Sequence, residues 1–175
     1  YARPMFEVTK LVDKTRVNYL LRQAWVHESG FDGDAPAITV AKLKQHEFVE
    51  VVADGATACF AVYSPLNQFA WQWHGAVKPE FRKRYWRRIA HALQDYAFKN
   101  GIIKLAALCP SRNRACAAFN KYSGMQVEGY LSAAHVDNDG KLDDLILFGM
   151  TKEQWNARHG DCGSGLDGAG SSPST

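Results

Sequence analysis

Residues 81–90, FRKRYWRRIA, decide how the chain is interpreted. They follow the strand-like run FAWQWHGAV, residues 69–77, and they begin a segment whose apolar residues recur at helical spacing. Many folds place a phosphate-binding loop at such a junction. That loop usually contains glycine, because the backbone must approach the phosphate closely. Here arginine, lysine and aromatic residues stand instead, so the stretch is either a modified phosphate site or a basic helix start with another role.

Length and charge limit the class of protein. The 175 residues suffice for one domain with a hydrophobic core, and 46% of them are hydrophobic, as in ordinary globular proteins. The net charge is only +3, so the positive charge is local. Such a cluster predicts contact with a diphosphate, an acidic protein partner or nucleic acid, or else a solvated helix face, and no nucleic-acid-binding motif accompanies it. The cluster consists of Lys78, Arg82, Lys83, Arg84, Arg87 and Arg88.

The cysteines and the hydropathy pattern indicate a compartment. Cys59, Cys109, Cys116 and Cys162 form no CxxC pair, which favours a reduced intracellular environment and no metal site. No apolar run approaches the roughly 20 residues that a membrane-spanning helix needs, and no signal-peptide pattern is present. We therefore expect a cytoplasmic protein without membrane insertion.

Periodicity and turn signals predict a single α/β domain over residues 1–158. Asp54-Gly55 lies between two β-rich runs and predicts a hairpin, and Asn100-Gly101 predicts the end of a long helix. Asp13 is expected to cap the first helix. The expected strands are residues 5–11, 48–53, 57–63, 69–77, 102–108, 127–136 and 142–150, and the later expected helices are 37–46, 79–100, 111–122 and 151–155.

Residues 159–175 form a tail rich in glycine and serine. Such a composition is typical of disorder in an isolated chain. We expect a protein partner or a neighbouring copy of the chain to hold this tail.

Four local motifs occur in a fixed order: AVKPEFRKRY (76–85), IIKLAALCP (102–110), SRNRACAAFNKYSGMQVEG (111–129) and DDLILFGMTKEQW (143–155). The first resembles the strand-to-helix junction V-x-P-E-Y-R-G-x-G-x-G of the GNAT superfamily of acyl-CoA N-acyltransferases. The third resembles that family's N-x-x-A-x-x-x-Y-x-K-x-G-F-x-x-x-G, and the other two resemble its next strand and its last strand with the closing helix. The resemblance implies a mixed, mostly antiparallel central sheet, splayed near its middle, with helices on both faces.

The resemblance also implies a site for acetyl-CoA, whose pyrophosphate would lie on backbone N–H groups at the helix start. Aligned on Arg82, the family's two glycines fall on Tyr85 and Arg87, so arginine side chains would have to supply much of the binding. Asn113 matches the family and is also expected to cap the next helix, whether or not a cofactor binds. The implied cofactor-binding residues are Val77, Arg82, Arg84, Tyr85, Arg87, Arg88 and Asn113.

The catalytic groups of the family are changed as well. The tyrosine that reprotonates the leaving thiolate falls on Asn120, which cannot transfer a proton, and Tyr122 is two residues away on roughly the opposite side of a helix. No acidic base stands on the third strand of the central run. His74 is the candidate base there, and the alternative is a hydrogen-bonded structural histidine.

Two functions follow from these departures. The sequence also resembles degenerate GNAT-like proteins encoded by phages, which favours a non-catalytic binding or assembly protein, such as a virion or head-assembly component, in the host cytoplasm or the virion. Its protein partner or homo-oligomer would be contacted through the basic helix start and the tail. The alternative is an active acetyl-CoA-dependent N-acetyltransferase that acts on an amine of a protein or a small molecule, with His74 as the base.

Overall fold

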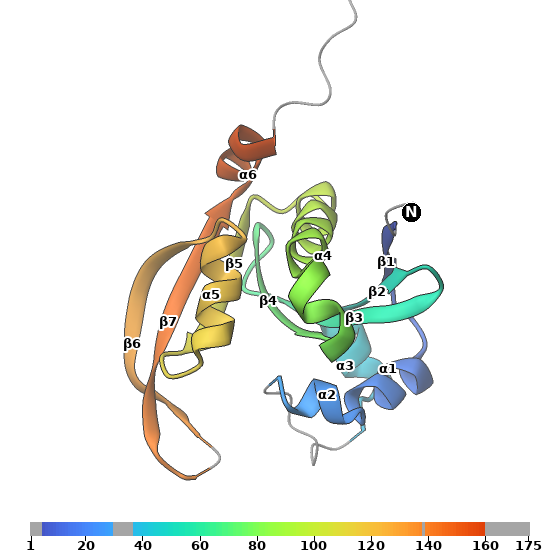
Figure 1. Cartoon of the computed structure of the whole chain (residues 1–175), viewed down its shortest axis with the longest axis horizontal. Helices are drawn as coiled ribbons and strands as arrows, with labels where there is room; N and C mark the ends of the chain where they lie inside the picture. Colours follow the sequence, from blue (N-terminus) through green and yellow to red (C-terminus); the bar gives the residue numbers. More distant parts are fainter. Residues whose placement is uncertain (1–4, 30–36, 138, 160–175) are drawn as a thin grey trace, which may run out of the picture.

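The computed structural model describes residues 5–29, 37–137 and 139–159. Its centre is a seven-stranded sheet of order β1-β2-β3-β4-β5-β7-β6 (Figure 1). Neighbouring strands are antiparallel except β4 and β5, which are parallel, so the predicted mixed, mostly antiparallel sheet is confirmed. The strands are β1 (Phe6–Lys10), β2 (Glu47–Ala53), β3 (Ala56–Pro65), β4 (Ala70–Val77), β5 (Lys104–Pro110), β6 (Gln126–Val136) and β7 (Leu142–Thr151).

Helices cover both faces of the sheet and bury two apolar clusters. The larger cluster lies under α4 and α5, and the smaller one lies under α1, α2 and α3. Because side chains alternate along a strand, Ala61 of β3 joins the first cluster and its neighbour Phe60 joins the second. The helices are α1 (Lys14–Leu21), α2 (Ala24–His27), α3 (Val40–Gln45), α4 (Pro79–Lys99), α5 (Arg114–Tyr122) and α6 (Lys152–His159).

The sheet splays between β4 and β5. These strands pair only at Ala70–Lys104, Trp71–Leu105 and Gln72–Ala106. Beyond these pairs β4 stays with β3 while β5 stays with β7, so the two parts of the sheet diverge, as Figure 1 shows.

Three local predictions from the sequence are confirmed: one hairpin, one helix end and one helix cap. Asp54 and Gly55 both adopt a positive φ, 49° and 80°, in the tight hairpin between β2 and β3. Helix α4 ends at Lys99, and Gly101 follows with φ 89°. The carboxylate of Asp13 accepts a hydrogen bond from the Thr15 amide at the start of α1.

Other boundaries differ from the prediction. The strand predicted at 102–108 begins at Lys104, because the chain still turns at Ile103, whose side chain is exposed. The helix predicted at 37–46 is shortened to α3, and the short α2 was not predicted. Helix α6 continues to His159, and residues 160–175, most of the predicted tail, lie outside the described residues. None of the helices in the described ranges is long and apolar enough to cross a membrane.

A partly buried ion pair fixes α1 to the sheet. Glu50 of β2 is 7% exposed, and the guanidinium of Arg16 donates to its carboxylate at 2.5 and 3.2 Å. Thr57 of β3 donates to the same carboxylate. Burial of the carboxyl acts against ionisation, but these hydrogen bonds prevail and lower the pKa of Glu50. The ion pair thus fixes the position of α1 on β2, and α2 follows α1 in the chain.

Candidate functional site

A cavity of about 430 Å³ lies where β4 and β5 separate. Its walls come from β3, β4, α4, β5 and α5, and Glu28 and Ser29, which follow α2, close one side. This volume falls within the range of small-molecule sites, roughly 300–1,000 Å³. The cavity is therefore the candidate functional site of the described part of the chain.

Small side chains make the deep part of the cavity. Gly75 of β4 faces Ala61 of β3, and a Cβ added at Gly75 would lie 3.5 Å from that of Ala61. Cys59 and Ala107 continue the same lining, and Leu93 of α4 contributes to it from the helix above the sheet. The depth of the cavity is thus apolar and open only because these positions carry so little volume.

The mouth of the cavity carries a cation and an anion. Arg82 of α4 donates from Nε to the carbonyl of Val77 at 2.8 Å, and its guanidinium lies 3.7 Å from the carboxylate of Glu28. All three residues line the cavity. Arg82 is therefore the predicted phosphate-binding arginine that the structure places at the site, with a carboxylate beside it that sequence reasoning missed.

The backbone at the start of α4 offers few donors. The helix is continuous from Pro79, so each amide from Lys83 onward bonds to the carbonyl four residues earlier. Pro79 has no N–H, and the amide of Phe81 bonds to the carbonyl of Lys78 at 2.9 Å. Tyr85 and Arg87, which align with the family's glycines, therefore have no free backbone amide, and side chains must supply most of any phosphate binding.

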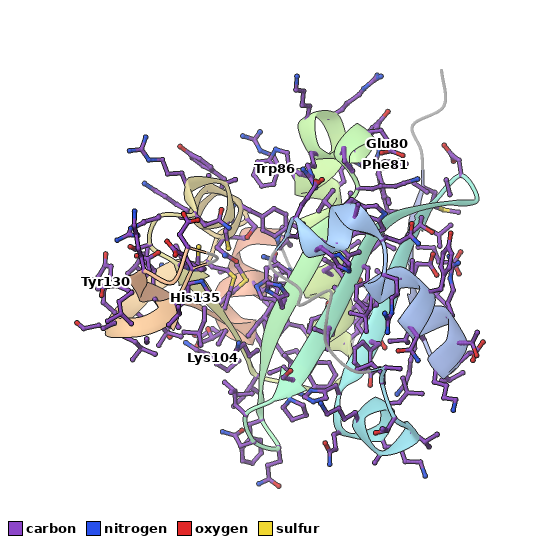
Figure 2. All side chains as sticks on the ribbon, turned by 90° about the horizontal axis from the view of Figure 1, so that it is seen from below. Glu80, Phe81, Trp86, Lys104, Tyr130 and His135 are labelled. Atoms are coloured by element: carbon purple, nitrogen blue, oxygen red, sulfur yellow. The ribbon has the colours of Figure 1, made fainter. Side chains whose placement is uncertain are left out.

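Tyr85 does not fill the cavity. Its ring packs against Phe6 of β1 and Phe81 of α4, with ring centroids 5.6 and 6.1 Å apart. The helical period carries this side chain into the core on the side of β1, and Trp86 leaves α4 on another side, toward α5 (Figure 2). The large side chain that stands in place of glycine at position 85 therefore does not close the cavity.

Three of the predicted cofactor-binding arginines do not line the cavity, and each of them lies over an aromatic ring. Arg84 stands over Tyr85 at 5.4 Å from the ring centroid, and Arg88 stands over Phe6 at 4.9 Å. Arg87 stands over Trp86 at 5.2 Å. Cation–π contacts of this kind at exposed sites contribute about 0.5–1 kcal/mol, so these arginines are partly engaged by the fold itself.

His74 lies on the opposite side of β4 from Gly75 and lines the cavity beside Ser29. Burial disfavours the charged imidazolium and lowers the pKa of His74, and a hydrogen bond with the backbone of Ser29 opposes this shift. The ring is therefore neutral near pH 7. A neutral imidazole in a cavity wall is able to accept a proton.

Helix α5 supplies the other wall. As predicted, Asn113 caps this helix, and its side-chain oxygen accepts a hydrogen bond from the Cys116 amide at 3.0 Å. Asn120 is 3% exposed; its Oδ1 accepts from Trp73 Nε1 at 3.3 Å, and its Nδ2 donates to the Cys116 carbonyl at 3.1 Å. The position of the family's tyrosine is thus used for a bridge between α5 and β4.

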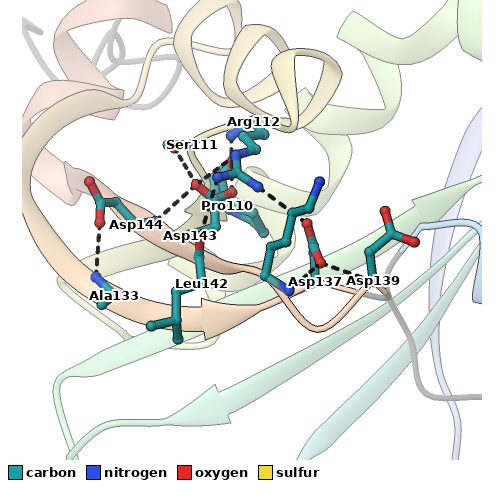
Figure 3. Close-up of polar contacts among 11 residues, drawn as sticks. Pro110, Ser111, Arg112, Ala133, Asp137, Asp139, Leu142, Asp143 and Asp144 are labelled. Atoms are coloured by element: carbon teal, nitrogen blue, oxygen red, sulfur yellow. Dashed lines mark hydrogen bonds and ion pairs between the residues drawn. The ribbon is translucent and has the colours of Figure 1, made fainter.

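Hydrogen bonds hold the connection between β5 and α5 (Figure 3). Asp143 of β7 accepts from the Ser111 hydroxyl at 2.6 Å and from the Arg112 amide at 3.2 Å. The Ser111 hydrogen bond is the main reason why the pKa of Asp143 is lowered. Next to it, Asp144 accepts from the Ala133 amide at 2.8 Å, which ties β6 into the same arrangement. This network sets where the first turn of α5 meets the cavity.

Some lining residues gave no signal in the sequence. Trp86 and Phe119 bring α4 and α5 together, with ring centroids 5.7 Å apart. Tyr122 is 59% exposed and lines the cavity, although helical geometry predicts that it lies on roughly the opposite side of the helix from position 120. Glu28 and Ser29 lie in a segment for which the sequence predicted neither a strand nor a helix. Tertiary packing brings these residues together, and their spacing in the sequence does not predict it.

Comparison with known proteins supports the fold. No family model and no curated protein sequence matches the chain. Among solved structures, spermidine N-acetyltransferase from Vibrio cholerae, in complex with CoA and spermine, matches with TM-score 0.69 and 14% identity over 86% of this chain and 97% of that one. Ribosomal-protein-S5-alanine acetyltransferase from Vibrio fischeri matches with TM-score 0.65 and 16% identity over 89% and 97%.

A GNAT-family acetyltransferase from Streptococcus pneumoniae matches with TM-score 0.64 and 16% identity over 84% and 99% of the two chains. Each match covers almost the whole of the other chain, so the likeness concerns the complete domain and not one motif. With the splayed seven-stranded sheet and the helix order, these matches show that the chain has the GNAT acyltransferase fold.

Proposed function

We propose that the cavity binds an acyl-CoA and that the protein transfers the acyl group to an amine. The observation that carries this proposal is one continuous cavity at the splay of β4 and β5, with Arg82 at its mouth and the neutral His74 in its wall. The Vibrio cholerae enzyme of the same fold was solved with CoA, which supports the same class of ligand here.

The residues present suit such a ligand. The apolar lining at Gly75, Ala61 and Leu93 fits the uncharged arm of CoA, and the guanidinium of Arg82 fits a phosphate. The ligand would supply an activated thioester carbonyl. Since the amides of α4 are engaged within the helix, we expect binding to depend on Arg82 more than on the backbone.

His74 would act as the base. As the amine nitrogen forms its bond to the acyl carbon and the carbon–sulfur bond breaks, the neutral imidazole accepts the proton that the amine loses. Asn120 has no proton to give to the departing thiolate, and its amide is already bonded to Trp73 and Cys116. The thiolate therefore takes its proton from solvent at the open mouth of the cavity.

Calorimetric titration with acetyl-CoA tests the binding step. Hydrogen bonds to charged groups contribute about 1.5–3 kcal/mol, and the Arg82 side chain is 43% exposed, so the lower end applies. Arg82→Ala should therefore weaken binding about tenfold. Arg88→Ala is the matched control, since Arg88 is on the same helix as Arg82 but lies over Phe6 of β1 and does not line the cavity. Absence of saturable binding to the unmodified protein would contradict the proposal.

Thiol release in the presence of a panel of amines tests the chemistry. A positioned base typically contributes about 10²–10⁴-fold, so His74→Ala should lower turnover by a factor in this range. Binding of acetyl-CoA to the same variant, measured by calorimetry, should change little. Turnover that survives the loss of His74 would assign the base to another group.

A non-catalytic role is the second candidate, and one observation favours it: the family's acid position is occupied by Asn120, which is bonded on both sides. An assembly role, in a phage virion or elsewhere, stays a prediction. It requires partner contacts through the basic helix start and residues 160–175. Deletion of 160–175 should then change oligomer size or abolish partner capture, whereas an unchanged assembly would count against it.

A further inference from the structure

Three thiols of the described residues stand at or near the cavity, and they differ in setting. Cys59 lines the deep part but is fully buried, and burial raises the pKa of its thiol. Cys109 of β5 is also fully buried and lies beside Cys116, without lining the cavity. Cys116 of α5 is half-buried and lines the cavity. Cys116 is thus the thiol that a bound ligand would meet in an accessible form.

The surroundings of Cys116 favour its thiolate. The residue lies in the first turn of α5, directly after the cap Asn113, where the helix dipole stabilises negative charge. The amide Nδ2 of Asn120 lies 3.6 Å from its sulfur. The thiol of Cys109 acts as a hydrogen-bond partner and lowers the pKa of Cys116 against the effect of burial. The thiolate, not the thiol, is the nucleophilic form of cysteine.

The pKa of Cys109 shifts in the opposite direction. Its pKa is raised by its contact with Cys116 and by burial, so it keeps its proton when Cys116 loses one. Its sulfur also lies 3.4 Å from the carbonyl of Pro110 and 3.6 Å from that of Asn113. These contacts hold Cys109 next to the first turn of α5. Cys109 is therefore a positioning residue for the thiol of Cys116.

We propose that Cys116 is a nucleophile that takes up the acyl group of a thioester bound in the cavity. The inference rests on the proposed binding of an acyl-CoA. The thiolate sulfur of Cys116 forms a bond to the acyl carbon, the bond from that carbon to the ligand sulfur breaks, and the ligand leaves as a thiolate that carries the negative charge Cys116 had. The product on the protein is an S-acyl-cysteine.

An amine would then attack the acyl group on Cys116. A carbon–nitrogen bond forms, the bond from carbon to the Cys116 sulfur breaks, and His74 accepts the amine's proton. The thiolate of Cys116 is restored within contact of Cys109 and Asn120. Two steps with a covalent intermediate would replace the direct transfer for which the acid at position 120 is missing.

Mass spectrometry of the full chain after incubation with acetyl-CoA and an acid quench tests the inference. One acetyl group is expected on the peptide that contains Cys116, and neutral hydroxylamine should remove it. The peptides that contain Cys59, Cys109 and Cys162 should stay unmodified. Cys116→Ser should lose the adduct while its calorimetric binding of acetyl-CoA persists. An adduct that remains in Cys116→Ser would overturn the assignment.

Alkylation by iodoacetamide gives a readout that needs no acyl ligand. Cys116 should be alkylated at least tenfold faster than Cys59. In Cys109→Ser, which keeps a hydroxyl near the Cys116 sulfur, the alkylation rate of Cys116 should stay closer to that of the unmodified protein than in Cys109→Ala. Saturable acetyl-CoA binding without acetylation of Cys116 would overturn this inference alone. Absence of any acetyl-CoA binding would overturn the proposed function and this inference with it.

Discussion

The hydrogen bond between Trp73 and Asn120 joins β4 to α5 across the splay of the sheet, and its contribution to the free energy of unfolding can be measured. Trp73→Phe keeps an aromatic ring beside Phe119 but removes the indole N–H that Asn120 Oδ1 accepts. Asn120 is only 3% exposed, and leaving a buried acceptor without its donor costs about 1–3 kcal/mol. The loss of ring volume adds to this, so we expect a substantial fall in the free energy of unfolding.

Trp71→Phe is the matched control. Trp71 stands on the same face of the same strand and packs on Tyr63 at 5.3 Å, but among the described residues its indole N–H has no hydrogen-bond partner. In urea denaturation at pH 7, Trp73→Phe should lose about 1–3 kcal/mol more than Trp71→Phe. In a chain of this size that difference lowers Tm by roughly 2–4 °C per kcal/mol. Equal losses in the two variants would refute the reasoning.

Three further predictions concern charge and backbone. Glu50→Gln should destabilise the fold by about 1–3 kcal/mol at pH 7 because it breaks the ion pair to α1. The pKa of Glu50 is lowered in the folded state, so in urea titrations this loss should persist down to the ordinary glutamate pKa, about 4.3, and shrink as pH falls further through the lower pKa of the folded state. Glu28→Gln should strengthen calorimetric binding of acetyl-CoA up to about fivefold by freeing Arg82, less so at high salt. Gly124→Ala should cost about 1–3 kcal/mol in the same urea assay, since Gly124 has φ +100°, whereas an equal stability would deny that strain.

Local signals were sufficient for much of the fold. A tight hairpin needs residues that tolerate positive φ, and Asp54-Gly55 supplies them in a few letters. The cap at Asn113 and the glycine after α4 work in the same way, because each depends on one residue and its immediate neighbours. The order of such elements then allows few sheet topologies.

The cavity could not be predicted in the same way. The cavity depends on where β4 stops pairing with β5, and these strands are about thirty residues apart in the chain. It also depends on the small residues Gly75 and Ala61, which lie opposite each other on neighbouring strands. In the sequence, Cys116 stood out only as one of four cysteines that form no CxxC pair. Only the packing of α5 against β5 brings its thiol to the cavity beside Cys109.

The stretch at residues 81–90 shows how a lost glycine can change a site without closing it. Without glycine, the chain forms helix from Pro79 onward, and the amides that a loop would leave free are consumed by helical hydrogen bonds. The same helical period turns Tyr85 into the core and keeps Arg82 at the mouth of the cavity. A flexible arginine loses more side-chain entropy on binding than fixed amides do, and its attraction is screened by salt. Phosphate binding here should therefore be weaker and more salt-dependent than in a glycine loop, although the cavity behind it stays open.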